Sequence, residues 1–149
     1  MIGIAQILLH LPRILVVDEP TAGLDPRERI RFRNLLVQLS RDRVVIFSTH
    51  IIEDISSSCN QVAVLNKGEL KYLGNPQEMA ETAKGSVWQV EVSVSEFDKL
   101  SEEYKVVHHM RDGQKIRVRL LAAEKPTEEA IPVTPLLEDA YLWMLGKKL

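Results

Sequence analysis

The sequence is poor in the features that mark secreted and membrane-spanning proteins. It has one cysteine, Cys59, in 149 residues, so no disulfide can form within the chain, and a lone thiol fits a reducing compartment. Its longest apolar runs extend over a few residues, far short of the roughly 20 that a transmembrane helix needs. The first twenty residues also lack the basic and then apolar pattern of a signal peptide. We therefore expect a cytoplasmic protein without direct membrane insertion.

Basic residues are not in excess either. The chain has 19 Lys and Arg against 21 Asp and Glu, a formal net charge of −2. Because binding to a phosphate backbone depends on Lys and Arg, this balance argues against a nucleic-acid partner. A composition that is 45% hydrophobic and 27% charged is typical of a folded globular chain, long enough for one domain and a small appendage.

A strand that ends in two carboxylates is predicted near the start of the chain. Ile14-Leu15-Val16-Val17 is uninterrupted and mostly β-branched, and Asp18, Glu19 and Pro20 follow it directly. The absence of polar positions inside the run predicts a strand that is buried on both faces. In open parallel sheets ligands bind at the carboxyl end of the strands, so the two acids are placed to meet a metal or a phosphate.

A second strand of the same kind is predicted over residues 44–47, and it ends at Ser48-Thr49-His50. The helix between the two strands is expected to begin after Asp25, with Asp25 as its N-cap and Pro26 as its first residue. Apolar strands that alternate with helices predict a parallel α/β sheet. His50 then lies at the same edge of this sheet as the two acids.

The flanking segments complete the predicted first part of the fold, residues 1–84. Residues 2–11 have the spacing of an amphipathic helix, as shown by apolar side chains at intervals of three and four. Residues 61–65 are a third apolar strand, with a short antiparallel partner over 69–73, and Asn75 is expected to cap another helix.

The second predicted part, residues 85–149, has a different pattern. Apolar and polar residues alternate from Trp88, which predicts half-exposed strands and a small antiparallel βαββ unit over 86–121, with its helix capped by Ser95. The stretch 122–132 is rich in Pro and Glu and is predicted to be a linker. A last helix is expected from Thr134-Pro135 to Leu145, with Gly146 as its C-cap.

The motifs of the first part resemble those of the ATP-binding subunit of ABC transporters. Leu15-Val16-Val17-Asp18-Glu19 is similar to the Walker B motif, Gly23-Leu24-Asp25 to the D-loop and His50 to the switch histidine of the H-loop. The resemblance implies a partial P-loop NTPase-like parallel sheet with helices, followed by a small α+β accessory unit and a C-terminal helix. The closing stretch Leu137–Tyr141 resembles the end of subunits that serve ABC-2 type exporters.

The resemblance also implies a role for each matching residue. Asp18 would hold Mg²⁺ through its water shell, because Mg²⁺ dehydrates reluctantly. Glu19 would be the general base that polarises the attacking water, and His50 would hydrogen-bond the γ-phosphate of ATP. Asp25 would contact a second ATP-binding domain across a nucleotide-sandwiched dimer. The implied cofactors are ATP and Mg²⁺, and the implied partners are that second domain and a membrane permease, at the inner face of the cell membrane.

The phosphate-binding loop of this family has no counterpart in the sequence. No Gly-x-x-x-x-Gly-Lys-Ser/Thr run occurs in the 149 residues, and neither does the Ser-Gly-Gly signature. We therefore expect a truncated ATP-hydrolysing subunit of an export system, one that binds ATP poorly and hydrolyses it negligibly on its own.

Two alternatives come from other classes of protein. A non-catalytic interaction module would dock to an intact ATP-binding subunit, with residues 86–121 as its binding surface. The distal half of a DNA-repair or chromosome-structure ATPase would share the same motifs, but those proteins require long heptad segments, which are absent from this sequence. His10, His108, His109 and Cys59 have neither metal-ligand spacing nor a neighbouring base, so we expect structural or surface roles for them.

Overall fold

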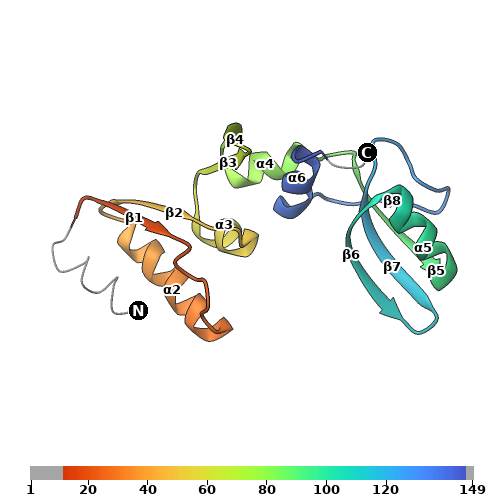
Figure 1. Cartoon of the computed structure of the whole chain (residues 1–149), viewed down its shortest axis with the longest axis horizontal. Helices are drawn as coiled ribbons and strands as arrows, with labels where there is room; N and C mark the ends of the chain where they lie inside the picture. Colours follow the sequence, from red (N-terminus) through yellow and green to blue (C-terminus); the bar gives the residue numbers. More distant parts are fainter. Residues whose placement is uncertain (1–11, 147–149) are drawn as a thin grey trace. The chain divides into compact units, whose positions relative to one another are not determined.

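The computed structural model describes residues 12–146, and the chain divides into two compact units, Met1–Asn60 and Gln61–Leu149. Figure 1 shows the elements of both units along the chain. The predicted helix over residues 2–11 lies outside the described residues. Within them, no helix has the length and apolar character that crossing a membrane requires.

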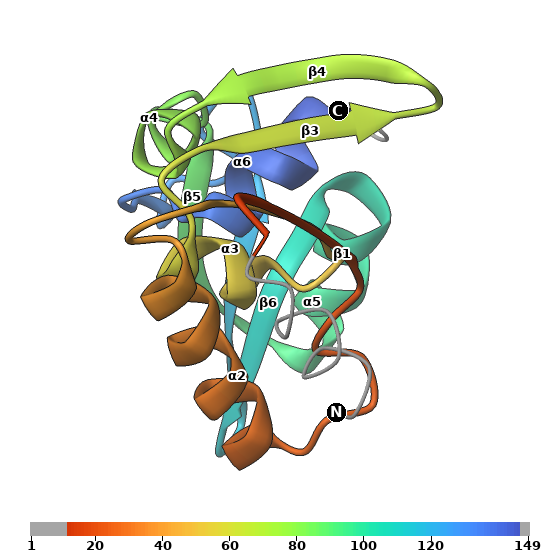
Figure 2. The same cartoon turned by 90° about the vertical axis from the view of Figure 1, so that its left-hand side faces the viewer.

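The first unit is a β-α-β-α arrangement. Strand β1 (Ile14–Asp18) is followed by helix α2 (Pro26–Leu39), strand β2 (Val44–Ser48) and helix α3 (Ile52–Ser58). The two strands pair in parallel, from Ile14 opposite Val44 to Asp18 opposite Ser48, which confirms the predicted parallel pairing. Figure 2 shows α2 beside this pair of strands.

Helix α2 begins as its sequence predicts. The Asp25 carboxylate accepts a hydrogen bond from the backbone N–H of Glu28 at 2.8 Å, and Pro26 occupies the first turn, where its missing N–H costs nothing. Phe32 and Leu36 are the buried residues of the helix, and Leu15 is the buried residue of β1. These three side chains supply the small core of the first unit.

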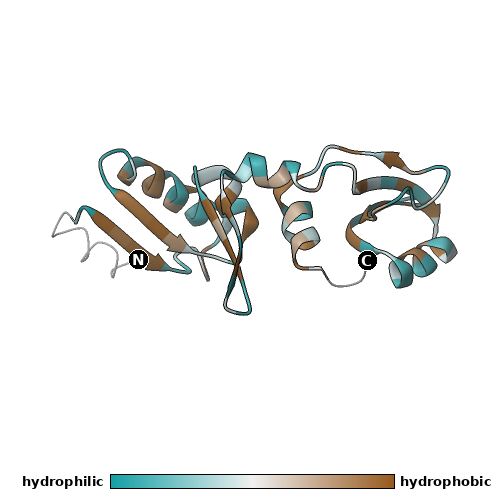
Figure 3. Cartoon of the chain, turned by 90° about the horizontal axis from the view of Figure 1, so that it is seen from above, coloured by the Kyte–Doolittle hydropathy of each residue, from teal (hydrophilic) through white to brown (hydrophobic). Residues whose placement is uncertain are grey.

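The prediction that the first two strands are buried on both faces is wrong for this chain. The alternate residues Ile14 and Val16 are 61% and 67% exposed, and Val44 and Ile46 of β2 are 55% and 52% exposed. These four residues pair with one another in the ladder, so they form one continuous apolar face. Figure 3 shows both strands coloured as hydrophobic along their length. The apolar character of these residues predicts burial on both faces, whereas in the described structure only one face of the two-stranded sheet is covered.

The second unit starts with a hairpin. Strands β3 (Val62–Asn66) and β4 (Glu69–Gly74) form a separate two-stranded antiparallel sheet. The residues of the connecting turn, Lys67 and Gly68, both have positive φ angles, 51° and 80°, which is the requirement of a type I′ turn. Helix α4 (Pro76–Glu81) follows, and the Asn75 side chain accepts from the Gln77 N–H at 2.7 Å. The hairpin and the Asn75 cap confirm the prediction.

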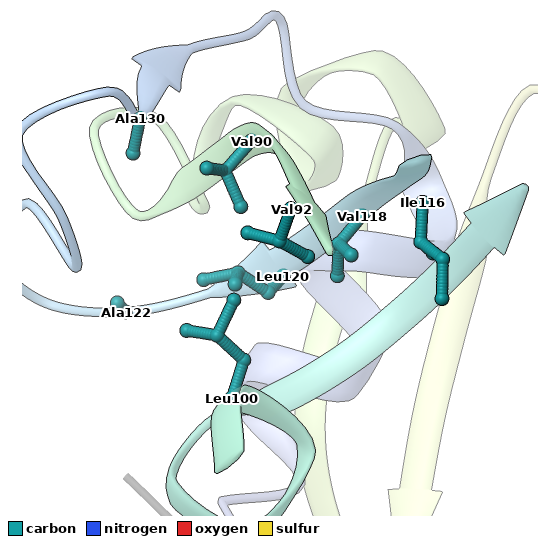
Figure 4. Packing of buried hydrophobic residues seen from close by; sticks show 8 residues of the cluster. All are labelled: Val90, Val92, Leu100, Ile116, Val118, Leu120, Ala122 and Ala130. Carbon is teal, nitrogen blue, oxygen red and sulfur yellow. The ribbon is translucent and has the colours of Figure 1, made fainter. Parts of the chain in front are cut away.

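A four-stranded antiparallel sheet forms the rest of the second unit. It contains β5 (Val87–Ser93), β6 (Lys105–Asp112), β7 (Lys115–Leu121) and the two-residue β8 (Ile131–Pro132), in the order β6-β7-β5-β8. Helix α5 (Val94–Glu103) connects β5 to β6, as the βαββ prediction requires. Its buried cluster, drawn in Figure 4, consists of Val90, Val92, Leu100, Ile116, Val118, Leu120, Ala122 and Ala130.

Two predicted boundaries of this sheet need correction. Helix α5 is capped by Ser93 and not by Ser95, because Glu96 stands three residues after Ser93 and accepts hydrogen bonds from its N–H (2.8 Å) and its hydroxyl (2.6 Å). The stretch predicted as a linker contributes β8 and the buried Ala130. An alanine inside a Pro- and Glu-rich segment gives no sign in the sequence that it belongs to a core.

The last helix, α6 (Leu137–Met144), is shorter than predicted, since its N-cap is Leu136. Its Asp139 is buried and binds Arg119 of β7 through two hydrogen bonds, Nε to Oδ1 at 3.0 Å and Nη2 to Oδ2 at 2.6 Å. Lys105 of β6 donates to the Leu142 carbonyl at 3.0 Å. The last helix is therefore attached to the sheet by charged side chains. The C-cap is Leu145, and Gly146 follows it with a φ of 42°, as is common one residue after a helix.

Candidate functional site

The candidate site lies at the carboxyl ends of β1 and β2. Asp18 is the last residue of β1 and pairs with Ser48, the last residue of β2. Glu19 and His50 follow these strand ends within two residues. The parallel pairing thus brings three residues predicted from the sequence, Asp18, Glu19 and His50, to one edge of the sheet, which is where ligands bind in sheets of this kind.

Ser48 connects the two strand ends. Its hydroxyl donates to Oδ1 of Asp18, and the Glu19 N–H is shared between the Ser48 hydroxyl oxygen at 3.2 Å and the Ser48 carbonyl at 3.0 Å. One oxygen of Asp18 is therefore oriented, and the backbone of Glu19 is held against β2. Reasoning from the sequence missed Ser48. The signal that could have identified it is its position opposite Asp18 in the predicted parallel register.

Glu19 and His50 form a direct pair. Oε1 of Glu19 lies 2.9 Å from Nδ1 of His50. Because a carboxylate only accepts, Nδ1 carries the proton in this contact, and Nε2 is left for another partner. The second oxygen of Glu19, Oε2, is buried and has no hydrogen-bond partner among the described residues. A buried carboxylate oxygen without a donor is suited to accept a proton or a hydrogen bond from a water molecule.

The backbone of Glu19 is also unusual. Its φ angle is 44°, in the left-handed region, where residues with a Cβ are strained by about 1–2 kcal/mol. Strain of this kind is found most often at functional sites, where the surrounding contacts enforce it. Here the N–H bonds to Ser48 and the carboxylate bond to His50 supply that enforcement.

A buried polar network lies behind the site. The Thr21 hydroxyl donates to Oδ2 of Asp54 at 2.5 Å, and both residues are 1% exposed. Arg33 of α2 lies 3.6 Å from Oδ1 of Asp54 and donates to the carbonyl of Glu53 and the hydroxyl of Ser57, each at 3.2 Å. This network joins α2, α3 and the loop after β1. Reasoning from the sequence gives no role to Thr21 or Asp54, because Thr21 is expected in the turn after the first strand and Asp54 near the start of a short helix.

Asp25 takes a different place from the other predicted residues. It is exposed, and its carboxylate caps α2. None of its hydrogen bonds or ion pairs in the described structure leads to Asp18, Glu19 or His50. The structure therefore brings together three of the four predicted site residues and places the fourth at the start of the neighbouring helix.

The residues fit a magnesium ion that keeps most of its own ligands. No group of three or more His, Cys, Asp or Glu among residues 12–146 is arranged to hold a metal, so a cage built from the described protein alone is excluded. Mg²⁺ commonly uses one or two carboxylates together with water and phosphate oxygens. Asp18 presents such a carboxylate at an exposed strand end, with one oxygen oriented by Ser48.

The single cysteine has no chemical role in this site. Burial, and after it the negative charge of Asp54, raise the pKa of the Cys59 thiol to about 11. A reactive cysteine has a lowered pKa, since the thiolate is the nucleophile. Cys59 is therefore a protonated and weakly reactive thiol at neutral pH, as predicted from its lack of a neighbouring base.

Comparisons with known proteins identify relatives along the whole chain. No protein-family model matches it. The chain is 32% identical over 166 residues to the uncharacterized ABC transporter ATP-binding protein YhcH of Bacillus subtilis, covering 98% of this chain and 52% of that protein. It is 35% identical over 91 residues to the uncharacterized ABC transporter ATP-binding protein YxlF of the same organism, covering 61% of this chain and 31% of that protein.

A third relative comes from a different group of transporters. The energy-coupling factor transporter ATP-binding protein EcfA2 of Lactiplantibacillus plantarum is 36% identical over 80 residues, covering 52% of this chain and 27% of that protein. The chain spans about half the length of YhcH and less of the other two. These relationships agree with the motifs at the ends of β1 and β2, and the chain belongs to the ABC transporter ATP-binding protein family.

Proposed function

We propose that this chain is the Walker B, D-loop and H-loop part of an ATP-hydrolysing subunit that drives transport through a membrane permease. In this proposal residues 1–84 are the carboxyl-terminal part of the ATP-binding domain, and residues 85–149 are an accessory region. The subunit works at the inner face of the membrane as one of two ATP-binding domains, with ATP and Mg²⁺ as its cofactors. The resemblance to ABC-2 type exporters favours export as the direction of transport.

The contact between Glu19 and His50 is the observation that carries the proposal. Their side chains meet at 2.9 Å although they are 31 residues apart in the chain, and the resemblance to the family implies a role in hydrolysis for both. Glu19 keeps a buried, unpartnered oxygen that can accept the proton of an attacking water. A positioned base of this kind contributes about 10²–10⁴-fold to a rate.

The other site residues have supporting roles in this proposal. Asp18 holds the water shell of Mg²⁺, whose chemistry, when it is bound, is to neutralise charge on the phosphates. With Nδ1 bonded to Glu19, His50 has Nε2 available for the γ-phosphate, and it can donate to both partners when the ring carries two protons. Asp25 contributes its second carboxylate oxygen to contacts with the partner domain, since Oδ1 caps α2.

The phosphates themselves need a cradle that these 149 residues do not contain. We therefore propose that this chain hydrolyses ATP only when a phosphate-binding loop is supplied with it. The test starts with the DNA immediately upstream of the codon for Met1, read in all three frames for that loop and for a Ser-Gly-Gly run. The upstream segment is then joined to residues 1–149 in one polypeptide, and this polypeptide and its Glu19→Gln variant are assayed for ATP hydrolysis.

The expected result is hydrolysis by the joined polypeptide and a loss of about 10²–10⁴-fold in kcat in Glu19→Gln. Glu53→Gln is the matched control, because Glu53 is an exposed acid three residues after His50 whose carboxylate is not part of the site. Equal rates in the two variants would refute the assignment of Glu19 as the base. ATP turnover by residues 1–149 alone that Glu19→Gln abolishes would refute the need for an added loop.

The alternative function is a non-catalytic module that docks to an intact ATP-binding subunit through residues 86–121. This alternative predicts that the chain binds an intact subunit with the same affinity whether or not Glu19 is replaced, and that no phosphate loop is encoded upstream. Nucleotide affinity measured for the chain alone and with an intact subunit distinguishes the two functions.

A further inference from the structure

Asp54 is a fully buried acid whose position is not explained by the packing of the first unit. It lies in the first turn of α3 and is 1% exposed. Its Oδ2 accepts from Thr21, and its Oδ1 has no hydrogen-bond partner in the described part of the chain, since Arg33 at 3.6 Å attracts it by charge only. A buried carboxylate with an incomplete set of donors is costly, and an apolar residue of similar volume is often at least as stable.

The residues of the network lie close in sequence to the residues of the candidate site. Thr21 follows Glu19 by two residues, and Asp54 follows His50 by four. The ladder between β1 and β2 ends at Asp18 and Ser48, so the segments that carry Glu19 and His50 lie beyond the last strand pair. The Thr21–Asp54 bond therefore joins these two segments a second time, in addition to the contact between Glu19 and His50.

Arg33 fixes the network to the rest of the unit. It donates to the Glu53 carbonyl and to the Ser57 hydroxyl, at both ends of the turn of α3 that carries Asp54, while its own backbone lies in the middle of α2. Helix α3 is only seven residues long, too short to hold its orientation without contacts of this kind. Arg33 therefore keeps α3, and with it Asp54, in place against α2.

We propose that Thr21 and Asp54 are positioning residues, which hold the Glu19 carboxylate and the His50 ring within hydrogen-bond distance of each other. Two hydrogen bonds connect the two segments: one joins Thr21 to Asp54, and the other joins Oε1 of Glu19 to Nδ1 of His50. The backbone from Glu19 to Thr21 and from His50 to Asp54 completes a closed ring of contacts. A role of this arrangement in catalysis rests on the proposed function. The inference that Thr21 and Asp54 hold Glu19 and His50 in contact does not depend on it.

The experiment measures the Glu19–His50 contact directly, in the full chain and without nucleotide. Histidine side chains are labelled with ¹³C and ¹⁵N, and the imidazole signal of His50 is identified as the one of four that disappears in His50→Gln. Glu19→Gln is then introduced into the wild type and into Thr21→Val, which has nearly the same shape as threonine but no hydroxyl. The quantity compared is the displacement of the His50 signal caused by Glu19→Gln in each background.

In the wild type we expect a clear displacement, because the charge and the acceptor beside Nδ1 change. In Thr21→Val we expect the His50 signal to have moved already, and Glu19→Gln to add a displacement no larger than the measurement error. Thr21→Ser keeps the hydroxyl and should behave as the wild type does. Thr82→Val is the matched control, since the Thr82 hydroxyl also donates an internal bond, at 2.6 Å to the Met79 carbonyl, but in the second unit.

A displacement of wild-type size in a folded Thr21→Val chain would overturn the proposal, even if its resistance to urea had fallen, because a purely structural contact predicts that combination. Should Thr21→Val fail to fold, Asp54→Leu gives the same test, because leucine has a similar volume and cannot accept from the Thr21 hydroxyl. A displacement of wild-type size on adding Glu19→Gln to a folded Asp54→Leu chain overturns the proposal equally. Because no ATP is present, a failure of the proposed hydrolysis leaves this measurement and its conclusion intact.

Discussion

Replacing Asp139 by asparagine should destabilise the second unit strongly. The Asp139 carboxylate is 1% exposed and accepts three hydrogen bonds. Two come from the Arg119 guanidinium, to Oδ1 and to Oδ2, and the third comes from the backbone N–H of Leu136 to Oδ2 at 2.6 Å. Arg119, whose side chain is 18% exposed, also donates to the Thr134 carbonyl at 2.8 Å. An amide at position 139 removes the charge and turns an NH₂ group toward one of these donors.

The magnitude follows from leaving a charge without its partner. Removing one member of a buried ion pair costs about 3–5 kcal/mol, and because asparagine keeps one acceptor oxygen we expect a loss of about 3 kcal/mol. With a urea dependence of about 1–3 kcal/mol per molar, the unfolding midpoint should fall by at least about 1 M. Total stabilities of about 5–15 kcal/mol make this a large share of what holds the unit folded.

The same sheet provides a matched control. Glu91 and Arg117 form a pair with the same chemistry on neighbouring strands, Nη2 to Oε1 at 2.9 Å, but both side chains are 47% exposed. Solvent screens such pairs, so Glu91→Gln should cost less than about 1 kcal/mol. Both variants neutralise an acid that is paired with arginine; they differ in burial and in the backbone bond that Asp139 also accepts from Leu136.

Tryptophan fluorescence follows this unit alone. Both tryptophans of the chain, Trp88 and Trp143, lie in the unit Gln61–Leu149, so urea titrations that record their emission do not report the first unit. Equal midpoints for Asp139→Asn and Glu91→Gln would refute the reasoning, and so would a cost below 1 kcal/mol for Asp139→Asn.

Three further predictions concern a thiol, a turn and a helix cap. With the pKa of Cys59 raised from 9.0 to about 11, the thiolate fraction at pH 8 falls about 100-fold, while the greater nucleophilicity of a more basic thiolate raises the rate per thiolate roughly tenfold. Iodoacetamide should therefore label the native chain about tenfold more slowly than the urea-unfolded chain, and equal labelling rates would contradict the raised pKa. Gly68→Ala, at a φ of 80°, should lower the stability of the second unit by about 1–2 kcal/mol, whereas Lys67→Asn should raise it slightly because asparagine tolerates the left-handed region; urea titration of both variants checks the opposite signs. The pKa of Glu96 is lowered by the hydrogen bonds from the Ser93 side chain and backbone, so the contribution of Glu96 to stability is present above the ordinary pKa of 4.5 and is lost as the pH falls below it. Between pH 6 and pH 3 the wild type should therefore lose more stability than Glu96→Gln, and equal losses would show that the Glu96 carboxylate does not stabilise the cap.

Local signals in the sequence account for much of what was predicted correctly. Asp25 before Pro26, Asn75 before Pro76 and the residues 66–68 each specify a cap or a turn by the chemistry of two or three neighbours. The parallel pairing of β1 with β2 follows from their apolar composition and the helix between them. Because this pairing brings the strand ends together, it also brings Asp18, Glu19 and His50 to the same edge of the sheet.

What was missed depends on contacts between segments that are distant in the sequence. The exposure of Ile14 and Val16 reflects which face of the sheet is covered, and this is a property of the neighbours of a strand and not of its own residues. The local sequence does not show that Ala130 belongs to the core or that Asp54 binds Thr21, because both depend on contacts that form only on folding. The cap at Ser93 was within reach of the sequence, since Glu96 completes the Ser-x-x-Glu spacing there.

At position 19 the left-handed backbone favours residues other than glutamate, whereas the contact with His50 requires the glutamate carboxylate. Glycine relieves the strain at a φ of 44° and asparagine tolerates it, so both Glu19→Gly and Glu19→Asn are candidates for a gain in stability of up to about 1–2 kcal/mol. Each also removes the carboxylate that meets His50. Selection for stability alone would therefore drive position 19 away from glutamate, and a library screened only for folding or expression should become enriched in chains that have lost the base.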